Sequence, residues 1–373
     1  MILPRCVWVE QKLRITFCIP SLGSGGAERV VSVLANKFTE HEHEVSIVML
    51  SHYKCVYPLS KKINIECLNC DDDMELSFLK RYPLRLKKLR NAIKKTTPDI
   101  VISFMSETNI DVCFAMHGIG IPLIVSERND PKIDPASKIK QIMRKIAYIK
   151  PKGFVFQTPD AKEYFSKRIQ NKSRIILNPL ADYLPTAYSG ERDKRIVSVG
   201  RLNKQKNFPM LLDAFSLFVE KHPEYILEIY GEGVLQEQLS DYIKEKALKD
   251  KVILKGFCKD VHSKILSAGL YIMASDFEGM PNALLEAMAI GLACISTDCP
   301  CGGPRMLIKS YENGILVPVN DRERMLDAMN YMVENPDKAE EMSRKATAVN
   351  EVARVDSITE QWLDFVRICK EKD

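Results

Sequence analysis

Residues 14–38 read RITFCIPSLGSGGAERVVSVLANKF, which joins an apolar run, a glycine-rich turn and an amphipathic run in succession. The apolar run, Arg14–Ser21, has the length of a strand, and Ala27–Phe38 carries apolar residues at helical spacing. Glycines at positions 23, 25 and 26 stand between them. A strand that leads through such a turn into a helix is the repeating unit of a parallel sheet, so this stretch predicts an α/β fold.

The same alternation continues along both halves of the chain. Further strands are predicted in the first half at Glu44–Leu50, Asp99–Met105, Pro122–Ser126, Gly153–Gln157 and Arg174–Leu177. The stretch Asn178–Asp193 contains two prolines and a glycine and is interpreted as a linker. Beyond it, strands are predicted at Arg195–Gly200, Tyr225–Tyr230, Val252–Gly256, Leu270–Ala274 and Ala293–Thr297. We therefore predict two doubly wound parallel-sheet domains in tandem.

The chain length agrees with two domains, because 373 residues exceed the roughly 100–200 of an ordinary one. We place the first domain at residues 1–180 and the second at residues 181–355. The last segment, residues 356–373, has helical spacing, and we expect it to pack back on the first domain. Four of its apolar residues fall on one face, namely Trp362, Phe365, Val366 and Cys369.

The composition is that of a soluble globular protein, with 46% hydrophobic and 28% charged residues. No run approaches the roughly 18 consecutive apolar residues of a membrane-spanning helix. Residues 1–11 are a poor match to a secretion signal, so we expect a cytoplasmic protein. Residues 1–180 hold 29 basic and 18 acidic residues, whereas the remainder holds 25 basic and 31 acidic ones. This positive first half is suited to an anionic partner.

The cysteines do not predict a metal site or a disulfide framework. There are eleven of them, an odd number scattered along the chain, which favours free thiols in a reducing compartment. The CxxC at Cys67 and Cys70 and the CxC at Cys299 and Cys301 each lack a second ligand pair. The triple aspartate at residues 71–73 has the spacing of a metal-binding DxD motif, but a solvated loop is the favoured interpretation. We expect no metal and no cofactor.

Two predicted strand-to-helix junctions offer groups that suit a phosphate. At the first, Gly25 and Gly26 would let backbone N–H groups approach an anion at the positive end of a helix. The spacing is not GxGxxG, so a tight structural turn is the alternative. At the second, VGRLNKQKN at residues 199–207 ends a strand and then presents Arg201, Lys204 and Lys206. Three cations at the carboxyl end of a parallel strand could neutralise a diphosphate, and a solvated loop is the alternative.

A third junction, DFEGMPNALLE at residues 276–286, carries two carboxylates. Glu278 precedes a predicted helix, Pro281 occupies an early helical position, and Glu286 lies just over two turns on. Carboxylates accept hydrogen bonds from sugar hydroxyls, and the exposed N–H groups at residues 279–282 could hold hydroxyl or anionic oxygens.

Taken together, GSGGAER, VGRLNKQKN and the Glu-x7-Glu block EGMPNALLEAMAIGLACISTD resemble glycosyltransferase family 4. The resemblance spans almost the whole chain and implies the GT-B fold and sugar transfer with retention of anomeric configuration. The run TDCPCGGPR at residues 297–305 further resembles bacterial members that build capsule, exopolysaccharide or lipopolysaccharide O-chains. Among these, enzymes that use UDP-sugars, including UDP-N-acetylgalactosamine, are the most similar.

The resemblance also implies roles for individual residues. Arg201 and Lys206 would bind the donor diphosphate and stabilise the departing UDP. Glu278 would contact the donor sugar, and Glu286 would hold the ribose. The remaining contacts to the nucleotide sugar would come from Gly25, Gly26, Gly256, Phe257, Gly279, Met280, Pro281, Asn282 and Ala283. In this scheme the second domain binds the nucleotide sugar, Gly256 and Phe257 receive the uracil, and two cations replace a metal.

One position departs from the family pattern. Relatives often place a histidine after the strand that corresponds to Pro122–Ser126, whereas this chain reads Ser126-Glu-Arg-Asn129. Either Glu127 or Arg128 would then supply the contact to the transferred sugar from the first domain.

Two basic segments in the first domain point to the partner. Residues 80–95 hold eight basic and no acidic residues, and residues 138–152 hold six and none. Basic amphipathic helices can lie on an anionic membrane, although the stripe of Leu86, Leu89 and Ile93 could instead pack on the sheet. The family's first domain receives the acceptor, so a polyprenyl-diphosphate-linked or saccharide acceptor at the inner face of the cell membrane would fit. Nucleic acid is not expected, because interleaved aromatics and reader motifs are missing.

We therefore expect a glycosyltransferase that moves a sugar, such as a hexose or N-acetylgalactosamine, from a UDP-sugar in bacterial surface-polysaccharide synthesis. Two alternatives remain open at the level of sequence. One is a sugar-nucleotide epimerase of the same fold, and the other is a nucleotide-binding protein without catalytic activity.

Overall fold

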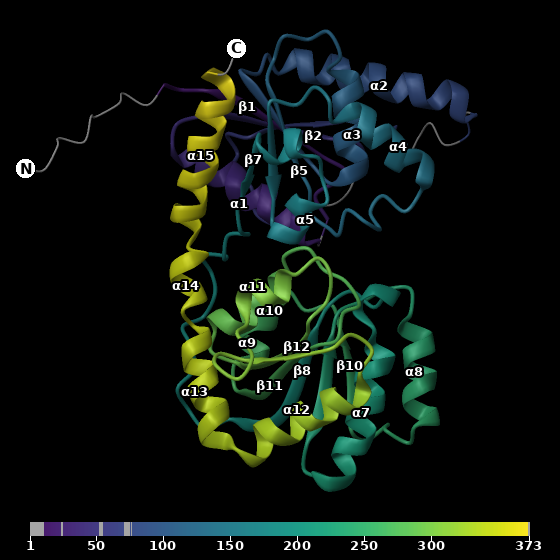
Figure 1. The fold of residues 1–373 in the computed structure, drawn as a ribbon, viewed down its shortest axis with the longest axis vertical. Helices are drawn as coiled ribbons and strands as arrows, with labels where there is room; N and C mark the ends of the chain where they lie inside the picture. The colour runs from purple at the N-terminus through teal and green to yellow at the C-terminus, as the bar shows by residue number, and fades with distance from the viewer. Residues whose placement is uncertain (1–10, 24, 52–54, 71–74, 76, 372–373) are drawn as a thin grey trace, which may run out of the picture.

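In each half of the chain the first strand is central, and the sheet grows outward from it in both directions. The computed structural model describes residues 11–23, 25–51, 55–70, 75 and 77–371, which form two lobes stacked along the long axis (Figure 1). The sheet of the first lobe has the order β3-β2-β1-β4-β5-β6-β7, and that of the second has β10-β9-β8-β11-β12-β13. Both sheets are parallel throughout. The predicted fold class is confirmed.

The first lobe contains seven strands and most of the helices that cover them. Its strands are β1 Arg14–Ile19, β2 Glu44–Met49, β3 Asn64–Cys67, β4 Ile100–Phe104, β5 Leu123–Ser126, β6 Gly153–Phe156 and β7 Ser173–Ile175. Its helices are α1 Gly26–Glu40, α2 Phe78–Lys95, α3 Ser106–Ala115, α4 Lys138–Ala147, α5 Pro159–Glu163 and α6 Lys167–Gln170.

The second lobe repeats the plan with six strands. Its strands are β8 Asp193–Val199, β9 Ile226–Tyr230, β10 Val252–Gly256, β11 Ala268–Met273, β12 Ala293–Thr297 and β13 Ile315–Val317. Its helices are α7 Phe208–Lys221, α8 Gln236–Glu245, α9 Val261–Ile265, α10 Asn282–Ala289, α11 Gly303–Leu307, α12 Arg322–Glu334, α13 Pro336–Ala346 and α14 Val349–Val352. A short 3₁₀ turn, Lys204–Lys206, follows β8.

The sequence analysis found every strand except β3 and β13, each of which lies at one edge of its sheet. Central strands of a parallel sheet are covered on both faces, so they read as continuous apolar runs. All five residues of β4 are buried, for example. The edge strand β3 reads Asn-Ile-Glu-Cys with no buried residue, so it leaves no apolar run in the sequence. Strand β13 reads Ile-Leu-Val, an apolar run of only three residues that the sequence analysis did not interpret as a strand.

The last helix, α15 Val355–Glu371, returns from the second lobe to the first and runs along its side (Figure 1). Its apolar face lies in the same core cluster as β1 and α1, with Trp362 fully buried. The Trp362 ring stacks on Phe104 of β4 with centroids 5.7 Å apart. The two lobes are thus linked twice, by residues 176–192 and by the segment that leads into α15.

Of the two basic helices of the first lobe, α2 buries its apolar stripe. Leu89 and Ile93 of α2 are fully buried in the core that contains strands β4 to β6. That apolar stripe therefore packs inside the lobe, as the alternative interpretation held. Within the described residues, no helix combines the length and apolar character that a membrane span requires.

Candidate functional site

The carboxyl ends of parallel strands lie at one edge of a sheet, and ligands bind where the strand order reverses. In the second lobe that point lies between β8 and β11. The loops after these strands bring Lys206 to Glu278, with Nζ 2.5 Å from Oε1. Two of the predicted site residues, 72 positions apart in sequence, thus form an ion pair where the fold predicts a ligand.

Glu278 is nearly buried and its carboxylate is held from several sides. The Ser275 hydroxyl donates to Oε1 at 2.8 Å, and the Gln205 amide lies 3.3 Å from Oε2. The backbone is fixed as well, because Glu278 exchanges hydrogen bonds with Pro300 and Cys301. Since β11 ends at Met273 and α10 begins at Asn282, Glu278 lies in the loop between them, before the helix. This loop is a rigid platform for one carboxylate and one ammonium.

Arg201 supplies a second cation on the loop that also carries Lys206. It lies two residues after the end of β8 and is exposed, and its charge acts on Glu28 of α1 in the first lobe. Burial raises the pKa of Glu28, and Arg201 opposes that rise. The aliphatic part of the Lys206 side chain packs against Gly200, where an added Cβ would lie 3.1 Å from Lys206 Cε. The cations predicted to meet a diphosphate therefore lie on one loop, at the carboxyl end of β8.

The glycine-rich turn of the first lobe contacts residues 274–282, which hold Glu278 and lead into α10 and are called the donor loop below. The Asn282 amide, at the start of α10, donates to the carbonyl of Gly26 at 3.1 Å. An added Cβ at Gly26 would lie 2.7 Å from that amide, so a larger residue would have to push the Asn282 side chain aside. Gly279 is similarly restricted, because its Cβ would lie 2.4 Å from the carbonyl oxygen of Arg128. Gly26, Gly279 and Asn282 are therefore brought together across the lobes.

Glu286 is held by partners that the sequence analysis did not name. The carboxylate pairs with the buried Arg29 guanidinium of α1 through Nη1, and it accepts from Nε2 of His262 at 2.7 Å. Burial and the nearby Arg29 lower the pKa of His262 to about 4, so the imidazole is neutral at pH 7 and donates. Burial also lowers the pKa of Arg29 below its usual value. The predicted ribose carboxylate thus joins both lobes in this structure.

A buried asparagine at the start of the interlobe segment connects the remaining groups. Asn178 accepts from Arg128 at 2.8 Å and from Gln157 at 2.5 Å through its Oδ1. Its amide donates to Asn282 Oδ1 at 2.6 Å and to the carbonyl of Met280 at 3.3 Å. The Asn178 side chain therefore bridges the first lobe, through its Oδ1, to the donor loop, through its Nδ2.

Arg128 and Glu127 are placed differently from each other. The Arg128 guanidinium lies over the Phe104 ring at 4.3 Å, and burial lowers its pKa to about 9. Its Nε and Nη2 atoms are buried without a hydrogen-bond partner among the described residues. Glu127 is 2% exposed, and its carboxylate accepts from the Tyr148 hydroxyl. Of these two residues, only Arg128 therefore has donors without a hydrogen-bond partner.

The other predicted contacts are spread along the same edge. Gly256 ends β10, and Phe257 is half exposed with its N–H 3.3 Å from Glu232 Oε1. Met280 is buried in the core of the second lobe, so its side chain faces away from a ligand and only its backbone is available. Pro281 and Ala283 lie at the start of α10. The triple aspartate at residues 71–73 lies outside the described residues.

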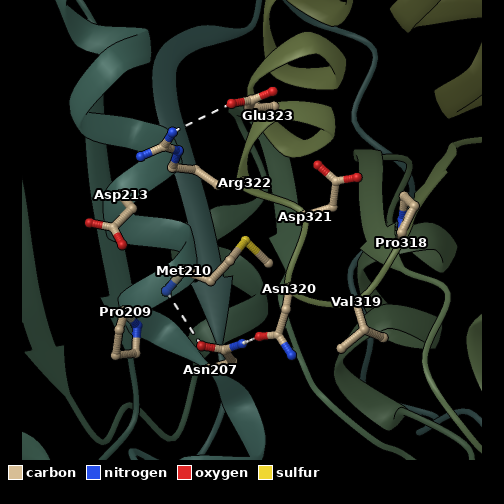
Figure 2. Close-up of a pocket in the computed structure, with 10 residues that line it drawn as sticks. All are labelled: Asn207, Pro209, Met210, Asp213, Pro318, Val319, Asn320, Asp321, Arg322 and Glu323. Carbon is tan, nitrogen blue, oxygen red and sulfur yellow. Dashed lines mark hydrogen bonds and ion pairs between the residues drawn. The ribbon is translucent and has the colours of Figure 1, made fainter.

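An open hollow lies next to this cluster, between the starts of α7 and α12 (Figure 2). Asn207 connects the two, since its amide donates to Asp276 at 2.7 Å and to Asn320 at 2.5 Å. The hollow is lined by three carboxylates, those of Asp213, Asp321 and Glu323, against the single cation of Arg322. This acidic lining does not suit a diphosphate, so the candidate site is the Lys206–Glu278 edge.

Sequence reasoning missed the residues that hold the site together. Arg29 was within the quoted GSGGAER motif and Asn178 began the predicted linker, but neither received a role. A polar residue directly after the last strand of a domain was the available signal for Asn178. His262 and Gln157 carry no local signal, because their partners lie 24 and 123 positions away.

Comparison with known families covers both lobes. Residues 187–349 match the family model for glycosyl transferases group 1, and residues 24–181 match the model for glycosyltransferase family 4. A Campylobacter jejuni relative, N-acetylgalactosamine-N,N'-diacetylbacillosaminyl-diphospho-undecaprenol 4-alpha-N-acetylgalactosaminyltransferase, is 31% identical over 87% of this chain and 91% of its own. A second C. jejuni alpha-1,4-N-acetyl-D-galactosaminyltransferase is 29% identical over 95% and 98%.

Solved structures share the fold at lower identity. Anabaena HepE in complex with UDP and glucose has a TM-score of 0.82, with 16% identity, over 95% of this chain and 99% of its own. The sucrose-phosphate synthase of Thermosynechococcus elongatus has a TM-score of 0.81 at 16% identity, over 95% and 98%. These likenesses establish a shared two-lobe architecture.

Proposed function

Since the chain belongs to glycosyltransferase family 4, we propose that it moves an N-acetylhexosamine or hexose from a UDP-sugar to a lipid-linked or saccharide acceptor. The reaction would serve bacterial surface-polysaccharide synthesis and proceed with retention of anomeric configuration. N-acetylgalactosamine is the favoured sugar, because both C. jejuni relatives are named as N-acetylgalactosaminyltransferases.

One observation carries the donor assignment. The Lys206–Glu278 pair lies at the switch point of the second sheet, Arg201 is on the same loop as Lys206, and Asn282, four residues after Glu278, contacts the Gly26 turn. A nucleoside diphosphate sugar needs cations for its phosphates and acceptors for its hydroxyls within a few ångströms of each other. This edge offers both, and the acidic hollow beside it does not.

The chemistry follows from where charge develops. As the bond between the anomeric carbon and the diphosphate oxygen breaks, positive charge grows on the sugar and negative charge on the diphosphate. Arg201 and Lys206 would stabilise the departing diphosphate as fixed cations, without a metal. The acceptor hydroxyl oxygen forms the new bond to the anomeric carbon, and its proton passes to a diphosphate oxygen.

Glu278 has a positioning part in this scheme. Its carboxylate holds the Lys206 ammonium in place and can accept from a donor-sugar hydroxyl with its remaining lone pairs. Arg128 extends the site from the first lobe, since two of its guanidinium nitrogens have no hydrogen-bond partner among the described residues. Glu127 would act indirectly, because its contact with Tyr148 holds the segment that carries Arg128.

The acceptor side would belong to the first lobe. The C. jejuni relatives carry undecaprenol in their names, so a polyprenyl-diphosphate-linked saccharide is the favoured acceptor. Such an acceptor would place the protein at the inner face of the cell membrane.

The donor assignment is tested by titrating the protein with UDP, GDP and NAD while following its melting temperature. We expect stabilisation by UDP and a loss of that effect in Glu286→Gln, which keeps the shape of the ribose carboxylate but not its charge. Stabilisation by NAD alone would overturn the proposal.

Glu228→Gln is the matched control, because Glu228 is also a buried carboxylate paired with an arginine, Arg195, in the second lobe. It should lose stability while keeping the response to UDP. UDP release from UDP-N-acetylgalactosamine in the presence of acceptor then separates a transferase from an epimerase or a binding protein.

A further inference from the structure

Helix α4 presents an apolar ridge to solvent. Four isoleucines at spacings of three, four and three residues fall on one side of the helix and its end, which is the spacing of a single helical face. Their exposed fractions are 71% for Ile139, 59% for Ile142, 56% for Ile146 and 50% for Ile149. A helix on a protein surface normally turns such a face inward, so this one needs an explanation.

The opposite side of α4 is already committed to the lobe. Arg144 is 2% exposed and donates to the carbonyls of Asp134 at 2.6 Å and Pro131 at 2.7 Å. Ala147 and Tyr148 are buried in the core beside it. Rotating the helix to hide the isoleucines would bury lysines and break these contacts. The exposure of the ridge is therefore built into the fold.

Positive charge flanks the ridge. Lys138, Lys145 and Lys150 are exposed beside the isoleucines, and residues 138–152 contain no acidic residue. An apolar face bordered by lysines is suited to the interface of an anionic bilayer, where the side chains reach the acyl boundary and the ammonium groups meet headgroups. A protein partner of similar size would not require a border of one charge sign.

We infer that α4 inserts its isoleucine ridge into the interface of an anionic lipid bilayer, whereas α2 contributes mainly charge, with Leu79 as an exposed apolar side chain. The contrast rests on burial, because Leu89 and Ile93 of α2 are fully buried. This inference rests on the proposed function, which supplies the lipid-linked acceptor.

The ridge is rigidly joined to the acceptor side of the site. Tyr148 follows α4 directly, and its hydroxyl donates to Glu127, the neighbour of Arg128. Lys140 pairs with Glu107 of α3 at 2.5 Å, which fixes α4 to the helix beside it. Insertion of α4 therefore holds the Arg128 edge close to the bilayer, where the sugar of a lipid-linked acceptor would emerge.

Ile142→Trp tests the insertion directly. With vesicles of phosphatidylcholine and phosphatidylglycerol, we expect its emission to shift to shorter wavelength and to be quenched by lipids brominated along the acyl chain, at a depth of about 5–10 Å. The shift should persist in high salt. Val234→Trp, at a position 88% exposed in the second lobe, is the control and should not shift. Spectra are taken as differences from the native protein, which has Trp8 and the buried Trp362.

A loss-of-function variant provides the second arm. Ile139→Ser with Ile146→Ser should lower vesicle co-sedimentation by about tenfold or more and leave stabilisation by UDP unchanged. An unshifted Ile142→Trp overturns the inference. So does a double variant that keeps vesicle binding but turns a dimer into a monomer in sedimentation, which would assign the ridge to a second copy. If UDP does not raise the melting temperature of the native protein, the donor proposal is overturned instead.

Discussion

At the scale of single residues, the site is defined by charges held in place before a ligand arrives. Lys206 is fixed by Glu278, and Glu278 is fixed in turn by Ser275 and by two backbone bonds of its loop. A cation held in this way does not have to reorganise when charge develops on a diphosphate, which is the condition under which electrostatic stabilisation is largest. The roles of these two residues are therefore coupled.

Lys206→Ala should lower kcat by about 10²–10³-fold, because a preorganised cation is removed from the developing diphosphate charge. UDP release from UDP-N-acetylgalactosamine with a lipid-linked acceptor measures it. The neighbouring Lys204 is exposed and belongs to the same turn, so Lys204→Ala is the control. Equal losses in the two variants would mean that only the overall charge of the loop matters.

Glu127 makes the stability of the first lobe depend on pH. Burial raises its pKa to about 7, so between its unfolded value near 4.5 and pH 7 the folded state binds more protons than the unfolded one. Its contribution to stability is therefore lost as pH rises through this window. Glu127→Gln cannot titrate, and its Oε1 still accepts from Tyr148.

We therefore expect the free energy of unfolding of Glu127→Gln, relative to the native protein, to increase by a few kcal/mol from pH 5 to pH 8. Denaturant unfolding at both pH values measures it. A difference that stays constant across the range would contradict the assignment.

At the scale of elements, the segment that leaves β7 acts as more than a connector. Asn178 accepts from two residues of the first lobe and donates to two groups of the donor loop. The same loop reaches back through Asn282 to the turn before α1. The relative position of the lobes and the shape of the donor loop are therefore set by one polar network.

Asn178→Ala should destabilise the protein by about 1–3 kcal/mol, because Arg128, Gln157 and Asn282 lose buried partners. It should also weaken stabilisation by UDP, since the donor loop is no longer tied to the first lobe. Asn171→Ala, at an exposed position after α6, is the control and should have little effect on either quantity. If Asn178→Ala lowers stability but binds UDP normally, the network is structural only.

At the scale of the whole molecule, α15 joins the lobes a second time. It leaves the second lobe at Val355, and its apolar face completes the core of the first lobe (Figure 1). Trp362 stacks on Phe104, and the guanidinium of Arg128 lies over both rings. The end of the chain thus supports the acceptor edge of the site.

Trp362→Ala should cost about 3–5 kcal/mol, because a fully buried indole leaves a cavity in the core. Gln361→Ala, exposed on the same helix, should change stability by less than about 0.5 kcal/mol. Denaturant unfolding compares the two. A loss under about 1 kcal/mol in the tryptophan variant would show that α15 is not integral to the first lobe.

The sequence alone determined the class of the fold and most of the donor edge. Central strands such as β1 and β4 are covered on both faces, so their apolar runs could be read without knowledge of the partners. The motifs at residues 199–207 and 276–286, which contain Arg201 and Glu278, could be recognised because each is a contiguous stretch that follows a predicted strand.

Only the tertiary structure decided which partners those residues have. The contacts of Arg29 with Glu286, of Asn178 with Asn282 and of Trp362 with Phe104 join residues more than 100 positions apart. It also decided which basic helix hides its apolar face, since α2 and α4 look alike in sequence and only packing buries Leu89 while exposing Ile139. Local pattern fixes what a segment can form, whereas burial depends on the surfaces that the rest of the chain brings to it.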